Sequence, residues 1–363
     1  MEKQMKFLKN LSASALMGSL LCLSPLSGFD YSPAQEASGK GIQLYGEYLY
    51  WKVVQDQMQY AAALPGGVEN ILRQIGEGEP PVRVREKLAI VDPKFNYNSG
   101  FRIGLGYAMG CSDWDFQLAW LRLHETVSSH VSDQSRGIIP ITIPASSLLG
   151  FVDRDPSGFG FASRADSCWR FELDVIDFQI GRSCHPFHSL SLSPYVGLKA
   201  AYVKQHQAIH YCGFAIEETP IDVHNAKKND FKAIGPSFEL DSSWELFPSL
   251  HLTSGIGGAL LFGKFDTGER PEISQASNSI QVCLDTSKQH RLRPVVDANI
   301  GIDWSRCLGD TCKLVIGVSY EVQYWWNQWQ VPASVESSLI NGGLSPQGDL
   351  MMYGLTVNAA ITF

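Results

Sequence analysis

The last fifteen residues of the chain, 349–363, alternate between two kinds of side chain. Every second residue from Met351 to Phe363 is apolar, whereas the residues between them are mostly small or polar. Successive side chains point to opposite faces of a β-strand, so this pattern predicts a two-faced strand. We interpret the final aromatic residue, Phe363, as the signal that the barrel assembly machinery of outer membranes recognises. The stretch therefore predicts an outer-membrane β-barrel, for which the rest of the chain has to supply the partner strands.

The opposite end of the chain predicts an export signal. Lys3, Lys6 and Lys9 precede an apolar run over residues 11–26. A charged segment followed by a short apolar segment is typical of a secretory signal peptide, and this run is too short for a membrane helix. We predict a signal peptide over 1–28 with cleavage between 28 and 34, a short periplasmic segment over 29–40, and a barrel over 41–363. The formal charge of −8 argues against a nucleic-acid partner.

Nine further segments show a two-residue period. They are residues 41–53, 99–110, 113–125, 168–180, 189–203, 231–244, 249–264, 290–304 and 311–326. The phase of the fourth slips near Ile176, which predicts a β-bulge. The connections between the segments are alternately long and short, which is typical of antiparallel outer-membrane barrels and not of a soluble sandwich.

The predicted fold is thus an all-β, antiparallel up-and-down transmembrane barrel with long extracellular loops and short periplasmic turns. We expect at least ten strands, because residues 82–91 and 137–149 inside two long connections are also strand-like. The number matters, since about eight to ten strands enclose an interior filled by side chains, whereas about sixteen leave an aqueous channel.

Charged residues lie opposite the apolar face of most predicted strands. An Arg or Lys that faces lipid near the bilayer midplane costs about 2–4 kcal/mol, so we expect these charges to face the lumen. The predicted pore-lining residues are Arg102, Asp115, Arg170, Glu172, Asp174, Lys199, Arg291, Arg293, Asp297 and Glu321. Two interpretations remain open, namely a charged pore wall that selects ions and solutes and a salt-bridge network that plugs a narrow barrel.

Aromatic residues cluster toward the ends of the predicted strands. We interpret them as girdles at the two membrane interfaces, where Trp and Tyr are enriched. They are Tyr48, Tyr50, Trp51, Trp120, Trp169, Trp304, Tyr324 and Trp326.

Seven of the eight cysteines remain once Cys22 leaves with the signal peptide. Cys307 and Cys312 flank a short predicted turn and could form a local disulfide if their Cα atoms lie within about 7 Å. Cys111 and Cys184 lie at other short predicted connections and are further disulfide candidates. Because seven is an odd number, at least one thiol is free or intermolecular.

The sequence predicts no metal, no cofactor and no enzymatic activity. Cys184, His185 and His188 share one short turn, but a fourth zinc ligand is not evident. His124 and Glu125 begin a metalloprotease pattern, yet residue 128 is Ser where a second His is needed. An outer-membrane protease or lipase would need an acid–base or nucleophile cluster near the bases of the loops, and none stands out.

Several motifs resemble the major outer membrane protein-like family of Legionella and environmental chlamydiae. They are the segments 49–52 (LYWK), 99–107 (SGFRIGLGY), 113–116 (DWDF), 194–199 (PYVGLK), 291–294 (RLRP), 325–328 (WWNQ) and 354–356 (GLT). The resemblance runs from about residue 41 to the end. It implies an abundant surface barrel, usually regarded as a porin and sometimes as an adhesin or surface antigen, without catalytic residues to carry over.

The leading hypothesis is an outer-membrane porin for passive diffusion of ions and small hydrophilic solutes that is also an abundant structural surface protein. The alternative is a structural or adhesive surface barrel with a plugged lumen, disulfide-linked in the cell envelope, as the chlamydial side of the resemblance suggests. The expected partners are outer-membrane lipid, the barrel assembly machinery, small solutes, and either envelope proteins or further copies of the chain.

Overall fold

The computed structural model describes residues 41–63, 89–109, 114–133, 137–142, 162–216, 219–275, 278–281, 284–285, 289–309, 312–331 and 347–363. The predicted signal peptide and periplasmic segment, residues 1–40, lie outside these ranges, as does Cys111. All regular elements in the described ranges are β-strands. No helix within them is long and apolar enough to cross a membrane.

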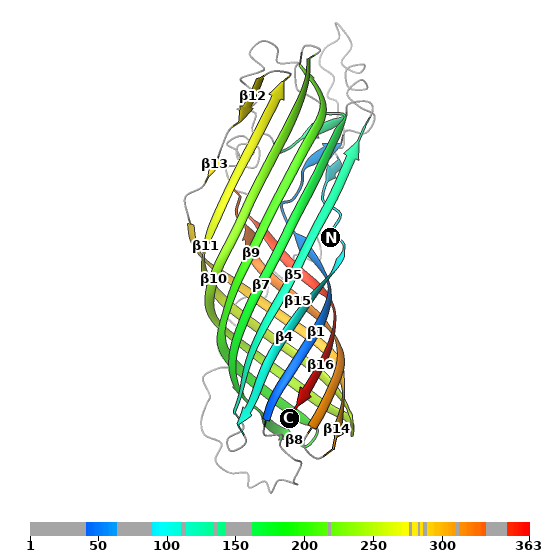
Figure 1. Cartoon of the computed structure of the whole chain (residues 1–363), viewed down its shortest axis with the longest axis vertical. Coiled ribbons are helices and arrows are strands. Elements are labelled where there is room, and N and C mark those ends of the chain that lie inside the picture. Colours follow the sequence, from blue (N-terminus) through cyan, green and yellow to red (C-terminus); the bar gives the residue numbers. More distant parts are fainter. Residues whose placement is uncertain are drawn as a thin grey trace, which may run out of the picture. The chain divides into compact units, whose positions relative to one another are not determined.

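Ten strands of the described ranges close into one antiparallel barrel (Figure 1). In order around the barrel they are β1 (Gly41–Gln55), β4 (Tyr97–Met109), β5 (Trp114–Ser132), β7 (Arg164–Arg182), β9 (Leu190–Ile216), β10 (Thr219–Phe247), β11 (Leu250–Gln275), β14 (Gln289–Leu308), β15 (Cys312–Trp329) and β16 (Gly348–Thr362). β16 pairs back with β1, so the sheet has no free edge. The predicted barrel is confirmed, with ten strands.

The short strands are not among the ten strands of this cylinder. β2 (Ala61–Ala63), β3 (Ala89–Val91) and β6 (Ile138–Pro140) form a separate three-stranded sheet. The strand-like runs at 82–91 and 137–149 therefore add no barrel strands within the described residues. β8 (Cys184–Phe187) pairs with β9, and both β12 (Asn278–Gln281) and β13 (Leu284–Asp285) pair with β11.

The connections define two ends of the barrel. We call one of them the turn end. There, residues 183–189 join β7 to β9, and residues 248–249 join β10 to β11. The start of β1 and the end of β16 also lie at the turn end. At the opposite loop end, residues 56–96 and 330–347 join neighbouring strands. The sequence predicts a long connection between residues 203 and 231. This prediction is wrong, because β9 and β10 continue as a paired hairpin through this stretch.

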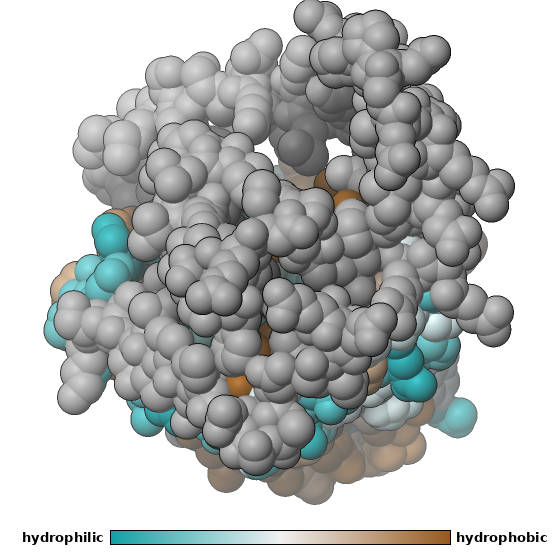
Figure 2. Space-filling view, turned by 90° about the horizontal axis from the view of Figure 1, so that it is seen from above, coloured by the Kyte–Doolittle hydropathy of each residue, from teal (hydrophilic) through white to brown (hydrophobic). Residues whose placement is uncertain are grey.

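An apolar band surrounds the turn-end half of the barrel. Its outward side chains are large and exposed in every barrel strand, for example Leu105, Phe178, Leu198, Ile300 and Leu355. Toward the loop end, the outward positions become polar or charged. Viewed from above (Figure 2), hydrophilic residues lie around the rim and hydrophobic residues beyond them. A membrane needs only about 9–11 residues per strand, so the 29-residue β10 reaches far beyond the apolar band.

The polarity of the two strand faces reverses where the strands leave this band. In β7, Ile176 and Phe178 face outward and are 51% and 47% exposed, whereas Trp169 and Phe171 face inward and are fully buried. The register between β5 and β7 continues without a shift from Trp114 to Ser132. The bulge predicted near Ile176 is therefore wrong, and the apparent slip in phase marks the change of the outer medium from apolar to aqueous.

The last strand has the two faces that its alternation predicts. Met352 and Thr356 face inward and are 0% and 1% exposed, whereas Leu355 and Val357 face outward and are 49% and 48% exposed. β16 pairs with β1 from Gln43 opposite Thr362 to Gln55 opposite Leu350. The first and last strands thus form the seam that closes the cylinder.

Candidate functional site

The lumen of the turn-end half contains a polar cavity of about 320 Å³, which we call the polar chamber. Inward positions of these strands carry polar groups because the outward positions carry the apolar side chains that face lipid. Among the residues that line the chamber are two basic ones, Arg102 and Lys199, and seven carboxylates: Glu47, Asp177, Glu239, Asp241, Asp297, Asp303 and Glu321. The chamber is therefore rich in acidic groups.

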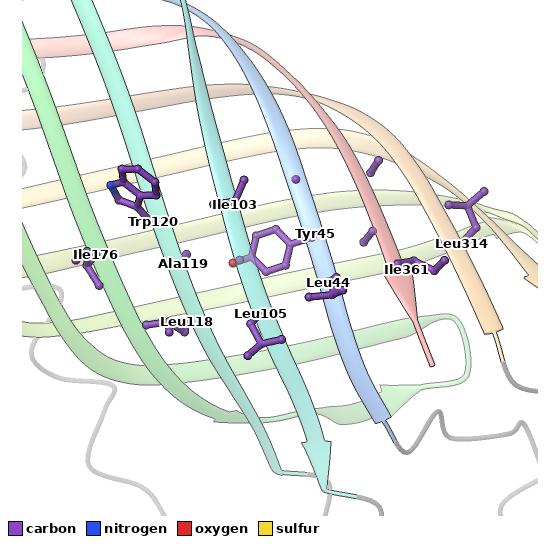
Figure 3. Close-up of a pocket in the computed structure, with 14 residues that line it drawn as sticks. Leu44, Tyr45, Ile103, Leu105, Leu118, Ala119, Trp120, Ile176, Leu314 and Ile361 are labelled. Atoms are coloured by element: carbon purple, nitrogen blue, oxygen red, sulfur yellow. The ribbon is translucent and has the colours of Figure 1, made fainter.

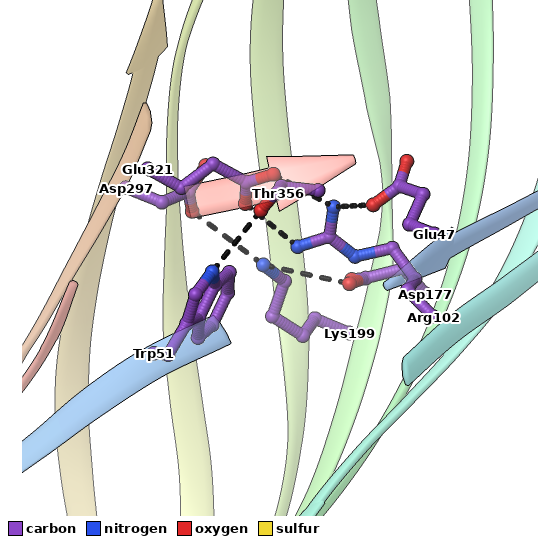
Figure 4. A network of polar contacts seen from close by, with 8 residues as sticks. All are labelled: Glu47, Trp51, Arg102, Asp177, Lys199, Asp297, Glu321 and Thr356. Carbon is purple, nitrogen blue, oxygen red and sulfur yellow. Dashed lines mark hydrogen bonds and ion pairs between the residues drawn. The ribbon is translucent and has the colours of Figure 1, made fainter. Parts of the chain in front are cut away.

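Arg102 of β4 holds two of these carboxylates (Figure 4). Its Nη2 lies 2.9 Å from Oε2 of Glu321 on β15, and its Nη1 donates a hydrogen bond to Oε2 of Glu47 on β1. The guanidinium carbon also lies 5.7 Å from the ring centre of Trp51. Arg102 thereby connects three strands on one side of the lumen.

Lys199 of β9 forms a second group of ion pairs. Its Nζ lies 3.5 Å from Oδ2 of Asp177 on β7 and 3.6 Å from Oδ1 of Asp297 on β14. A Cβ on Gly257 of β11 would lie 2.5 Å from Oδ2 of Asp297, so glycine leaves the space that this carboxylate occupies. Lys199 thus reaches across the inner face of the sheet past β10 and β11.

A layer of apolar side chains, which we call the lumen core, lies on the loop-end side of the chamber. Leu121, Val175 and Trp325 belong both to the chamber lining and to this core. Nine of the ten barrel strands contribute buried side chains to it, among them Leu49, Trp51, Leu123, Trp169, Phe171, Val203, Phe231, Leu261, Val295 and Met352. Close-packed apolar side chains leave little room for water, and the lumen core is such a layer between the chamber and the loop end.

Connecting segments fill the lumen beyond the core. Inward-facing Gln207 donates a hydrogen bond of 3.1 Å from Nε2 to the carbonyl of Met58, and the hydroxyl of Tyr211 donates one to the carbonyl of Tyr60. From β10, Asn225 donates a 2.7 Å hydrogen bond to the carbonyl of Thr142. These strands therefore carry inward polar groups near the loop end that satisfy the backbone of inserted chain.

The inserted segments also bury apolar side chains. Tyr60, Ala61 and Ile138 form a second buried cluster with inward residues of the barrel, including Ile209 and Val223. Two barrel strands that are not neighbours in the sheet also contact each other inside the lumen. Nδ2 of Asn229 on β10 donates a 2.9 Å hydrogen bond to the carbonyl of Gln328 on β15. The described residues thus place buried apolar side chains inside the barrel at two levels.

Seven of the ten predicted pore-lining residues lie on the inward face. Arg102, Lys199, Asp297 and Glu321 line the polar chamber. Asp115 lies nearer the turn end and accepts a 3.3 Å hydrogen bond from the hydroxyl of Ser183. Arg291 and Arg293 have the strand parity of Asp297 but lie toward the loop end; Arg293 stacks on Phe265 at 5.1 Å, and exposed Arg291 donates a 2.9 Å hydrogen bond to Gln289.

The prediction that Arg170, Glu172 and Asp174 face the lumen is wrong. These residues alternate with the buried Phe171 and Leu173, so their side chains lie on the outer surface. Glu172 accepts a 3.1 Å hydrogen bond from Nζ of Lys204 there. The reason is that this part of β7 has already left the apolar band, where an outward charge meets water rather than lipid.

Sequence reasoning missed five of the chamber carboxylates: Glu47, Asp177, Glu239, Asp241 and Asp303. Asp177 alternates with Ile176 and Phe178, so the reversal of phase in β7 was the signal that could have found it. Asp303 lies on the same face of β14 as Asp297, so the two-residue period alone could have identified it as a lumen residue.

The predicted girdle divides between the two faces. Tyr48, Tyr50 and Trp304 are exposed on the outer wall, consistent with an interfacial position. Trp51 and Trp169 are fully buried in the lumen core, so their assignment to a girdle is wrong.

The described cysteines are all free thiols, namely Cys168, Cys184, Cys212, Cys307 and Cys312. A local bridge between Cys307 and Cys312 is not formed, because in the hairpin Cys307 pairs with Lys313 and Leu308 pairs with Cys312. Neighbouring residues of a strand face opposite sides, so the two thiols point away from each other. Intermolecular crosslinking stays a prediction.

A recess of about 950 Å³ lies mainly on the outward face, over β1, β4, β5 and β16 (Figure 3). Leu44, Ile103, Leu118 and Ile361 line it. A Cβ on Gly46 would have no neighbour within 4 Å, so this glycine contributes to the hollow. Because the recess lies in the apolar band, it suits hydrocarbon chains, and the polar chamber remains the candidate site.

The comparison with protein families matches most of the chain. A family model described as the Legionella pneumophila major outer membrane protein precursor matches residues 37–363. No curated protein matches the chain. Similar solved structures include the outer membrane protease OmpT of Escherichia coli, at 11% identity over 90% of this chain and 98% of that chain with a TM-score of 0.38. A major outer membrane protein of Thermus thermophilus follows, at 10% identity over 89% and 98% with a TM-score of 0.30.

Proposed function

Because this chain belongs to the family of the Legionella pneumophila major outer membrane protein, we propose that it is a surface barrel of the outer membrane whose lumen is closed. The barrel serves as a structural scaffold that presents its own loop end outside the cell. The function is non-enzymatic. Outer-membrane lipid surrounds the apolar band, and we propose that the barrel assembly machinery recognises β16 with Phe363.

One observation carries this proposal, namely the lumen core. Buried side chains from nine strands meet across the lumen, and a ten-stranded cylinder has little interior left for water. Several polar groups at either side of the core contact one another or inserted backbone, as Arg102 does with Glu321 and Asn225 with Thr142. Of the two functions that the sequence left open, this geometry favours the plugged structural barrel.

Conductance across a planar lipid bilayer tests the closed lumen. We expect refolded protein to insert without stepwise conductance, while a general diffusion porin in the same bilayer conducts. Refolding is checked by β-sheet circular dichroism and by the shift in gel mobility on heating. Regular conductance steps from the folded wild-type barrel would contradict the proposal.

The sequence also left open an adhesive role, that is, contact of the loop end with a host or neighbouring cell. Replacing residues 332–346, between β15 and β16, by a short Gly-Ser linker should reduce attachment of cells that display the barrel. A matched replacement of the turn 309–311 should leave attachment unchanged, because this connection lies at the opposite end. Attachment that is unaffected by the first replacement would count against adhesion through this connection.

A second candidate function is diffusion of ions or small hydrophilic solutes, favoured by the polar chamber at membrane depth. Its seven carboxylates outnumber its two basic groups, so a path through it would prefer cations. In this case, the bilayer experiment would give conductance with a reversal potential shifted toward that of the cation. Asp241→Asn with Glu239→Gln would reduce the shift.

A further inference from the structure

A cluster of metal-ligand side chains lies on the outer wall of the loop-end half. Asp166 belongs to β7, and His210 and Cys212 belong to the neighbouring β9. One carboxylate oxygen, one imidazole nitrogen and the sulfur of these residues lie within 4.8 Å of one another. The cluster is separate from the polar chamber, because all three side chains have the outward parity of their strands.

The strand register brings these residues together. Asp166 pairs directly with His210, and Arg164 pairs with Cys212. His210 pairs in turn with His224 of β10, whose ring is stacked on it at 3.9 Å between centres. Residues that are directly opposite in neighbouring strands have their Cβ atoms about 4.5–5.5 Å apart, so backbone pairing holds the donors close before any ion binds.

The surroundings provide room and further donors. A recess of about 420 Å³ beside the cluster is lined by Asp166, His210 and His224, and also by His130 and Cys168. Arg164 donates hydrogen bonds of 2.8 Å and 3.0 Å from Nε to the two oxygens of Asp166. Hydrogen bonds of this kind fix the orientation of the carboxylate ligands in metal sites.

We propose that Asp166, His210 and Cys212 form a surface site for Zn²⁺. Nitrogen, sulfur and carboxylate oxygen are the donors that zinc uses, commonly with three protein ligands and one open position. Hard cations such as Ca²⁺ and Mg²⁺ require oxygen ligands instead. Binding replaces the S–H bond of Cys212 by a Zn–S bond and releases the proton to solvent.

The sequence did not reveal this site because its donors come from different strands. Asp166, His210 and Cys212 do not form a metal-binding motif in the sequence. The sequence points instead to Cys184, His185 and His188, which are close together in the chain. With the loop end outside the cell, the Zn²⁺ site faces the medium. Its existence does not depend on whether the lumen conducts.

Titration with Co²⁺, a spectroscopic substitute for zinc, tests the site in the refolded, metal-free full-length barrel. We expect a near-ultraviolet thiolate-to-cobalt band and visible bands of four-coordinate geometry, both removed by excess Zn²⁺. Cys212→Ser should abolish the near-ultraviolet band, and His210→Ala and Asp166→Asn should each weaken binding at least about tenfold. Cys184→Ser, at the turn end beside two histidines, is the matched control and should keep the band.

A second measurement needs no variant. Zn²⁺ should slow alkylation of Cys212 in the wild-type barrel, followed by peptide mass spectrometry, and leave alkylation of exposed Cys307 unchanged. The proposal is overturned if folded wild-type protein shows no thiolate–cobalt band. Retention of the band in Cys212→Ser, its loss in Cys184→Ser, or unprotected Cys212 in excess Zn²⁺ would overturn it equally.

Discussion

The indole Nε1 of Trp51 donates a hydrogen bond of 3.1 Å to Oγ1 of Thr356. The two residues lie on β1 and β16, so this bond crosses the seam between the first and the last strand of the barrel. Both side chains are inside the lumen, where they are 0% and 1% exposed.

Thr356→Val keeps the shape of the side chain and removes the acceptor. Because the indole N–H stays buried without this partner, we expect a loss of about 1–3 kcal/mol in the free energy of unfolding. Urea-induced unfolding in detergent or lipid measures it. Thr126→Val, at an exposed outward position of β5, should change the free energy by less than about 0.5 kcal/mol. Equal effects of the two substitutions would rule out a stabilising role for the bond.

Arg102→Met leaves Glu47 and Glu321 in the polar chamber without their shared cation. Removing one partner of a buried ion pair costs about 3–5 kcal/mol, and we expect a loss of this size in the same unfolding experiment. Arg122→Met is the control, because its Nε lies 3.9 Å from Asp174 on the exposed outer wall, where pairs contribute about 0–1 kcal/mol. Adding Glu47→Gln and Glu321→Gln to Arg102→Met should restore most of the lost stability.

Glu125 gives the barrel a pH-dependent stability. This inward residue lies beyond the apolar band, between outward His124 and Thr126, and is 1% exposed. Burial raises the pKa of Glu125 from 4.5 to about 7. The unfolded chain therefore loses its proton at lower pH than the folded barrel does. The free energy of unfolding should fall as pH rises through this window, by about 3 kcal/mol at most.

Urea unfolding at a series of pH values between about 4 and 8 measures this dependence. Glu125→Gln should flatten the profile over the window, because the amide does not titrate. Glu172→Gln, which changes an exposed carboxylate of β7, is the matched control and should leave the slope of the wild type. A wild-type slope that survives Glu125→Gln would assign the pH dependence to another group.

The hairpin register predicts which thiols can be joined at the turn end. Cys307 lies directly opposite Lys313, so the variant that carries both Lys313→Cys and Cys312→Ser should form a disulfide on mild oxidation. The wild-type pair Cys307 and Cys312 should remain unbridged within one chain. Peptide mass spectrometry after alkylation distinguishes the two. An intrachain bridge between Cys307 and Cys312 would show that the register differs from the one described.

The two-residue period predicts the ten strands because each has one face toward lipid. The same reasoning places Arg102, Lys199, Asp297 and Glu321 correctly, since their neighbours Ile103, Leu198, Val296 and Tyr320 lie on the lipid side. It fails at Arg170, Glu172 and Asp174, where water has replaced lipid outside the barrel. The alternation is still present there, but it no longer says which face is the outer one.

The contacts inside the chamber were not predictable from the sequence. Arg102 meets Glu321 across two intervening strands, so their proximity depends on the stagger and curvature of the closed sheet. The inserted segments were missed for a related reason. Gln207 and Asn225 are ordinary polar residues in the sequence, and only the position of Met58 and Thr142 shows what they bind.

The reversal of polarity in β7 has a consequence for how the protein sits in its bilayer. The step from Asp174 to Ile176 marks the height at which the lipid surface meets this strand. Adding a pair of residues on the loop-end side of that step would lengthen the part that projects from the cell without altering the depth of insertion. A pair added between Ile176 and Arg182 would instead create a hydrophobic mismatch. How far the barrel stands out from the cell is therefore free to vary, whereas its immersion is set by the membrane.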